Sequence, residues 1–129
     1  MTTDTLLAAP RRSSIAARCP VSVIIPTLAS AERADLLDRA MKSVLTGQDH
    51  GIVLIVVANG NRYDAETLAS LKARRDIRFI YREEGSPAGA RLAGREAVDT
   101  EFFAPLDDDD EFLPGPFARQ LRYTRADPA

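Results

Sequence analysis

The sequence predicts an α/β fold, with a parallel sheet of about four strands and helices on both faces. Short β-branched apolar runs alternate with segments of helical periodicity. The connections between successive runs are longer than a dozen residues, as crossovers between parallel strands require. A chain of 129 residues can bury one hydrophobic core but is short for two, so a single domain is expected.

Four apolar runs are the expected strands. Residues 21–26 (VSVIIP) are almost continuously apolar, which is typical of a strand buried on both faces at the centre of a parallel sheet. Residues 52–57 (IVLIVV) and 77–81 are the second and third strands. The fourth, residues 102–106, contains Pro105, which donates no ladder hydrogen bond and therefore indicates a strand end, a bulge or an edge.

Three segments between these runs are the expected helices. Apolar residues recur at helical spacing between positions 37 and 45. Asp64 can cap a second helix, and Pro87 suits the first turn of a third helix, expected to run to Val98. Right-handed crossovers through these helices give a Rossmann-like sheet covered on both faces.

The two ends of the chain are expected to be tails around a domain at residues 21–124. In residues 1–20 the arginines follow a very short apolar run, whereas a secretory signal places its basic residues first. Residues 125–129 form the second expected tail. No segment approaches the roughly 18 to 20 continuous apolar residues that a membrane span requires.

Charge and cysteine content exclude several functions. The 17 basic and 19 acidic residues give a net charge of −2 without a long basic stretch, so nucleic acid is not an expected partner. Cys19 is the only cysteine, which rules out an intramolecular disulfide or a thiolate metal cluster and favours a reducing compartment. We expect a cytoplasmic location, either free or peripheral to the inner face of the membrane.

The sharpest chemical feature is the run of carboxylates at residues 107–111 (DDDDE). Adjacent carboxylates repel one another unless a cation gathers them. The run follows the fourth expected strand, and ligands of open parallel sheets bind beyond the carboxyl ends of the strands. Such oxygen ligands suit Mg²⁺ or Mn²⁺, whereas a solvated acidic turn is the alternative explanation.

Two other strand ends carry polar residues. Thr27 follows the first strand, and a turn at residues 58–61 (ANGN) follows the second. A phosphoacceptor receiver domain also gathers aspartates and Mg²⁺ on a parallel sheet. It would need acidic residues after the first strand, where this chain has Pro26 and Thr27.

Four segments in order, VSVIIPT, IVLIVVANGN, GARLAGREA and FFAPLDDDDEFLPG, resemble the family 2 glycosyltransferases of the GT-A fold. The resemblance runs from about residue 21 to about residue 121 and covers the N-terminal, nucleotide-sugar-binding region of that family. It implies a truncated GT-A fold. The implied activity is the transfer of a sugar from a nucleotide-diphosphate donor, expected to be of the UDP type, with inversion at the anomeric carbon.

The resemblance also implies roles for the acidic residues. Asp107, Asp108 and Asp109 occupy the family's DXD position. Asp109 is the candidate ligand of Mn²⁺ or Mg²⁺, and Asp107 and Asp108 are expected to face the ribose and the diphosphate. A metal bridging the diphosphate and a carboxylate would neutralise charge on the departing nucleotide.

Four further residues are implied in donor binding. Pro26 and Thr27 lie at the end of the first strand, with Thr27 expected near the base. Asn59 stands where the family usually has an aspartate that contacts the base, and an amide could serve uracil, thymine or guanine. Arg91 falls where the family places a basic residue near the base and phosphates. An ordinary surface arginine paired with a nearby glutamate is the alternative for Arg91.

An inverting transfer also needs a general base, which the family places well after the DXD position. Only 15 residues follow Pro114, and they offer no good candidate. The acceptor, whether saccharide, lipid or protein, is therefore expected to bind outside this sequence. The fourth strand is expected to be an exposed edge that could pair with another chain. A noncatalytic nucleotide-binding or interaction module is the alternative function.

Overall fold

The computed structural model describes residues 21–46, 52–112 and 124–125. The expected tail at residues 1–20 lies outside these ranges, as does the expected tail at residues 125–129 except for Arg125, which the structure places in a short strand. Strands and helices alternate through most of the described chain, so the predicted α/β class is confirmed. None of the helices among these residues is long and apolar enough to cross a membrane.

The sheet has the order β3-β2-β1-β4-β5, with β1 (Val21–Thr27) at its centre. β2 (Val53–Asn59) and β4 (Phe102–Pro105) flank β1 in parallel, and β3 (Arg78–Arg82) continues the sheet beyond β2. The chain therefore builds outward from β1 to β3 and then crosses back to the other side of β1. β5 (Thr124–Arg125) pairs antiparallel with β4.

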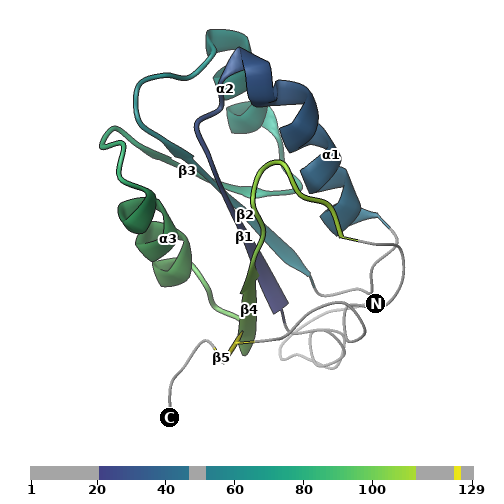
Figure 1. The fold of residues 1–129 in the computed structure, drawn as a ribbon. Helices are drawn as coiled ribbons and strands as arrows, with labels where there is room; N and C mark the ends of the chain where they lie inside the picture. Colours follow the sequence, from purple (N-terminus) through teal and green to yellow (C-terminus); the bar gives the residue numbers. More distant parts are fainter. Residues whose placement is uncertain (1–20, 47–51, 113–123, 126–129) are drawn as a thin grey trace.

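The helices cover both faces of the sheet (Figure 1). α1 (Ala34–Leu45), preceded by the 3₁₀ turn η2 (Ala31–Arg33), and α2 (Ala65–Ala73) lie on one face, and α3 (Pro87–Glu96) lies on the other. This division follows from right-handed crossovers that run in one direction along the sheet from β1 to β3 and in the opposite direction from β3 to β4. α3 ends two residues before the predicted Val98, because Ala97 caps it.

Side chains of the two central strands alternate between the helix layers, as the two-residue period of a strand requires. The larger core cluster lies against α1 and α2, whereas Ile24, Ile55 and Val57 pack with Ala90 against α3. The strand residues facing α1 and α2 are Val21, Val23, Ile25, Leu54, Val56 and Ala58. The central strands are therefore buried on both sides, as their apolar runs predicted.

α2 and α3 begin at the carboxyl edge of the sheet, and a side chain caps each of them. Asp64 accepts a 3.0 Å hydrogen bond from the Thr67 amide at the start of α2, which confirms the predicted cap. Ser86 caps α3 by accepting a 3.1 Å bond from the Gly89 amide, with Pro87 in the first turn as predicted. Each side chain satisfies a backbone donor that the helix leaves unpaired.

α3 lies unusually close to β1 at Gly94. A Cβ atom added there would stand 2.4 Å from Ile24 Cγ2, well inside van der Waals contact. Only glycine lets the helix approach the sheet this closely. This contact sets the distance between α3 and β1.

The prediction that the fourth strand is left as an edge is wrong over two residues. Phe102 and Phe103 pair with Arg125 and Thr124 of β5. A two-residue strand has no hydrophobic period, so its sequence carries no signal of pairing. Pro105 is the last residue of β4, in agreement with the predicted strand end.

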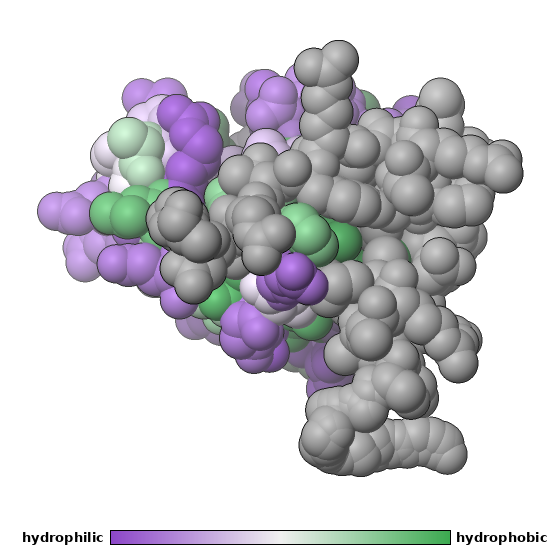
Figure 2. All heavy atoms as spheres, turned by 90° about the horizontal axis from the view of Figure 1, so that it is seen from below, coloured by the Kyte–Doolittle hydropathy of each residue, from purple (hydrophilic) through white to green (hydrophobic). Residues whose placement is uncertain are grey.

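The amino ends of the parallel strands lie on the underside of the molecule in Figure 1. Seen from that side, the described residues show apolar patches set among hydrophilic ones (Figure 2). The polar residues that the sequence singled out lie instead at the carboxyl ends of β1, β2 and β4.

Candidate functional site

A cleft of about 390 Å³ opens at the carboxyl edge of the sheet. Every residue predicted for donor or metal binding lines it, although these residues come from four separate segments of the chain. The predicted lining residues are Pro26, Thr27, Asn59, Arg91, Asp107, Asp108 and Asp109. Leu28, Arg33, Gly85, Pro87 and Ala90 complete the lining. The structure therefore brings all of the predicted residues together.

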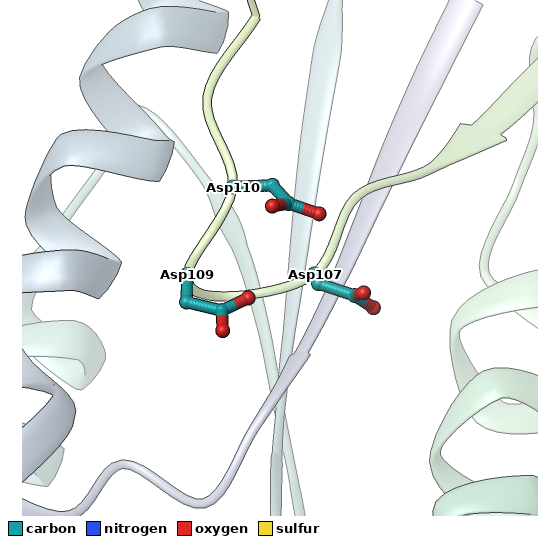
Figure 3. Close-up of side chains that lie close together, drawn as sticks. All are labelled: Asp107, Asp109 and Asp110. Carbon is teal, nitrogen blue, oxygen red and sulfur yellow. The ribbon is translucent and has the colours of Figure 1, made fainter.

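The acidic loop after β4 turns sharply, because the Asp110 amide donates a 3.1 Å hydrogen bond to the Asp107 carbonyl. This turn gathers the exposed carboxylates of Asp107, Asp109 and Asp110, which each offer one oxygen within 4.8 Å of the others. Figure 3 shows the three side chains around this turn. Carboxylate oxygens gathered in this way and open to water fit the preferences of Mg²⁺ or Mn²⁺. Asp110 joins Asp109 in this cluster, which the sequence did not predict.

Asp108 differs from its neighbours, since it is buried, with 7% of its surface exposed. One carboxylate oxygen accepts a 2.7 Å hydrogen bond from Thr27 Oγ1, and the other accepts a 2.6 Å bond from Arg33 Nη1. Both oxygens are thus bound within the protein. Asp108 thus contacts the end of β1 and the turn before α1, and it lines the cleft in which the resemblance implies a place beside the ribose and diphosphate.

Arg33 was missed by sequence reasoning. It ends η2 and lines the cleft, and Nη1 also lies 3.7 Å from an oxygen of Asp109. A signal was present, because Arg33 is the only basic residue between the first expected strand and the first expected helix. Arg33 therefore places a positively charged side chain of the protein beside the acidic run.

Asn59 is 5% exposed and held at both ends of its amide. Its Nδ2 donates to the Ser86 carbonyl at 3.0 Å, and its Oδ1 accepts from Arg82 Nη1 at 3.1 Å. Because Arg82 only donates and a carbonyl only accepts, these partners determine the orientation of the amide. Arg82 in turn binds the Glu84 carboxylate at 3.0 Å. The sequence missed Arg82, although it directly follows the third expected strand.

Arg91 is exposed on the first turns of α3 and lines the cleft. Among the described residues it forms no ion pair, and the nearby Glu84 binds Arg82 instead. The guanidinium is therefore available to an anion. The amino end of α3 beside it also favours negative charge.

Comparison with known proteins identifies the family. The model described as glycosyl transferase family 2 matches residues 22–129, so the chain belongs to this family. Uncharacterized glycosyltransferases of Rickettsia felis and Rickettsia conorii are each 30% identical to it, over 80% and 78% of this chain. The chain spans only 17% and 16% of the length of these relatives.

Solved structures share the fold. TarS 1–349 of S. aureus superposes with a TM-score of 0.59 and 23% identity, covering 73% of this chain and 28% of that one. A structure of the same TarS region in complex with UDP gives a TM-score of 0.59 and 19% identity over 74% of this chain and 29% of that one. The chain thus has part of a GT-A fold, as the sequence predicted.

Proposed function

We propose that the cleft binds a nucleotide-diphosphate sugar together with Mn²⁺ or Mg²⁺, and that the chain is the donor-binding part of an inverting glycosyltransferase. One observation supports this function above all. The predicted donor and metal residues come from four segments of the chain and line a single cleft. Membership of glycosyl transferase family 2 supplies the class of reaction.

The acidic loop would hold the cation through Asp109, with Asp107 and Asp110 as the neighbouring oxygen donors. When bound, the cation would neutralise negative charge on the diphosphate that leaves as the sugar bond breaks. Asp108 is not proposed as a ligand, because it is buried and its two oxygens already accept hydrogen bonds from Thr27 and Arg33.

Arg91 and the amino end of α3 would bind the phosphates. Arg91 has no ion-pair partner among the described residues, and the amino end of a helix carries partial positive charge. Both lie on the side of the cleft formed by α3, while the acidic loop lies after β4. The diphosphate would bind between these two groups.

Asn59 would contact the base. Ser86 and Arg82 hold the amide in one orientation, which leaves a second Nδ2 proton and a second lone pair on Oδ1 for a ligand. Uracil offers a matching carbonyl and N3–H. The fold is shared with a TarS structure solved with UDP, which supports a UDP sugar as the first donor to test.

Calorimetric titration with UDP, GDP and dTDP, each with Mn²⁺ and again with a chelator, tests the proposal. We expect UDP to bind in the presence of Mn²⁺ and to lose most of its affinity when the metal is chelated. Circular dichroism of the same sample would verify that the chain is folded. A folded chain that binds none of the three nucleotides contradicts the donor site.

Release of UDP from a UDP-sugar separates transfer from binding alone. A chain that binds UDP with Mn²⁺ but releases none from UDP-glucose in the presence of water or a simple alcohol would act as a nucleotide-binding module. Measurable release would show that the donor part supports cleavage of the sugar bond.

A further inference from the structure

We propose that Arg33 is a binding residue for the diphosphate of the donor, and that Asp108 is the positioning residue that holds it at the cleft. The proposal rests on the proposed donor site and extends it to a residue that none of the sequence motifs includes. Arg33 lies at the end of η2, lines the cleft and contacts two residues of the acidic loop.

The two contacts of Arg33 differ in strength. Nη1 lies 2.6 Å from Asp108, whose side chain is 10% exposed, and 3.7 Å from Asp109, whose side chain is 48% exposed. A short bond to a shielded carboxylate is stronger than a long contact between two solvated groups. Asp108 therefore anchors the guanidinium, and the contact with Asp109 is the one for which a cation would compete.

The guanidinium of Arg33 has N–H donors beyond those that bind the acidic loop. Both contacts to the acidic loop use Nη1, and the N–H groups of Nε and Nη2 donate to no residue in the described part of the chain. The planar fork of arginine matches phosphate oxygens. Because Arg33 lines the cleft, these N–H groups belong to a side chain that a bound anion can reach.

Asp108 cannot itself bind a diphosphate without a cation between them, since both are negatively charged. Its buried carboxylate already accepts from Thr27 and Arg33. Its charge can therefore favour donor binding by holding Arg33 in place. Asp108 would therefore affect donor binding through Arg33 and not through a contact of its own.

Two variants test this role by calorimetry, with UDP in saturating Mn²⁺ and with Mn²⁺ alone. Arg33→Gln should lower the affinity for UDP by roughly ten- to a hundredfold, the range for losing hydrogen bonds to a charged group. The same change should raise the affinity for Mn²⁺ alone, because it removes a positive charge beside the acidic cluster. A purely structural role for Arg33 would lower both affinities together.

The double variant Arg33→Gln/Asp108→Asn is the matched control for folding. It replaces a buried ion pair by two amides that can still hydrogen-bond, and it leaves the net charge of the cleft unchanged. Its affinity for Mn²⁺ alone should stay close to that of the unaltered chain, while its affinity for UDP should fall as in Arg33→Gln. Arg33→Lys should lie between, since it keeps the charge and loses the fork.

The outcomes separate the two proposals. If the unaltered chain binds UDP and the folded double variant binds it equally well, the role of Arg33 is wrong and the donor site stands. If affinities for UDP and Mn²⁺ fall together in both variants, Arg33 only maintains the acidic loop and the proposal is also wrong. If the unaltered, folded chain binds no nucleotide, both proposals fail.

Discussion

Thr27 and Asp108 are 81 positions apart in the sequence, yet Thr27 Oγ1 donates a 2.7 Å hydrogen bond to Asp108 Oδ2. Both residues are buried, at 5% and 7% exposure. Thr27 Oγ1 also accepts from the Ala29 amide at 3.0 Å. This hydroxyl therefore joins the end of β1, the loop after it and the acidic loop after β4.

Replacing Thr27 by valine should lower the free energy of unfolding by about 1–3 kcal/mol, because it leaves a buried carboxylate oxygen and a buried amide without their partner. Urea denaturation followed by circular dichroism measures the change. Thr27→Ser keeps the hydroxyl and should lose less. A larger loss in Thr27→Ser than in Thr27→Val would mean that the methyl group, which valine keeps, matters more than the hydrogen bonds.

Substitution of Asp109 and substitution of its neighbour Asp108 should have different effects on the stability of the protein. Asp109→Asn should change the free energy of unfolding by less than about 0.5 kcal/mol, since Asp109 is exposed and has only a long contact with Arg33. It should greatly weaken the binding of Mn²⁺. Isothermal titration with Mn²⁺ and urea denaturation of the same samples measure the two effects.

Asp108→Ala, in contrast, should lower the free energy of unfolding by about 1–3 kcal/mol, because it removes the partner of both Thr27 and Arg33. Asp38→Asn on the exposed face of α1 is a control for loss of a carboxylate far from the acidic loop. A marked loss of stability in Asp109→Asn, measured without metal, would overturn this division of roles.

Gly94→Ala should destabilise the protein by about 1–3 kcal/mol even though alanine is the better helix former, because the new methyl group would overlap Ile24 Cγ2. Thermal or urea denaturation measures the change. Gly85→Ala is the matched control, since its Cβ would meet only Gly60 Cα, at an ordinary 3.8 Å. A neutral Gly94→Ala would show that α3 can move away from the sheet without cost.

Asp64→Ala should cost about 1 kcal/mol of stability by removing the cap of α2, whose oxygen accepts from both the amide and the hydroxyl of Thr67. Asp64→Ser restores a capping oxygen and should recover most of the loss. Denaturation midpoints of the two variants make the comparison. No difference between them would indicate that the charge of Asp64, and not its cap, stabilises the helix.

The fold was largely predictable because its signals are local. The β-branched runs predicted both central strands, β1 and β2, and Asp64 as a cap and Pro87 as a first-turn residue predicted two helix starts. The short β5 was not predictable, because two residues have no period and their pairing depends on where the chain returns. The end of α3 was missed by two residues for a similar reason, since helix ends have weaker signals than helix interiors.

The sequence by itself placed Thr27, Asn59 and the acidic run at one edge of the sheet, because the carboxyl ends of parallel strands share one edge and these polar residues lie at or just after strand ends. Only the tertiary structure decided how the roles of the acidic residues differ. Burial separates Asp108 from the exposed Asp107, Asp109 and Asp110, and it does so through partners at Thr27 and Arg33. Adjacent identical residues have identical local chemistry, so only their distant neighbours can make them different.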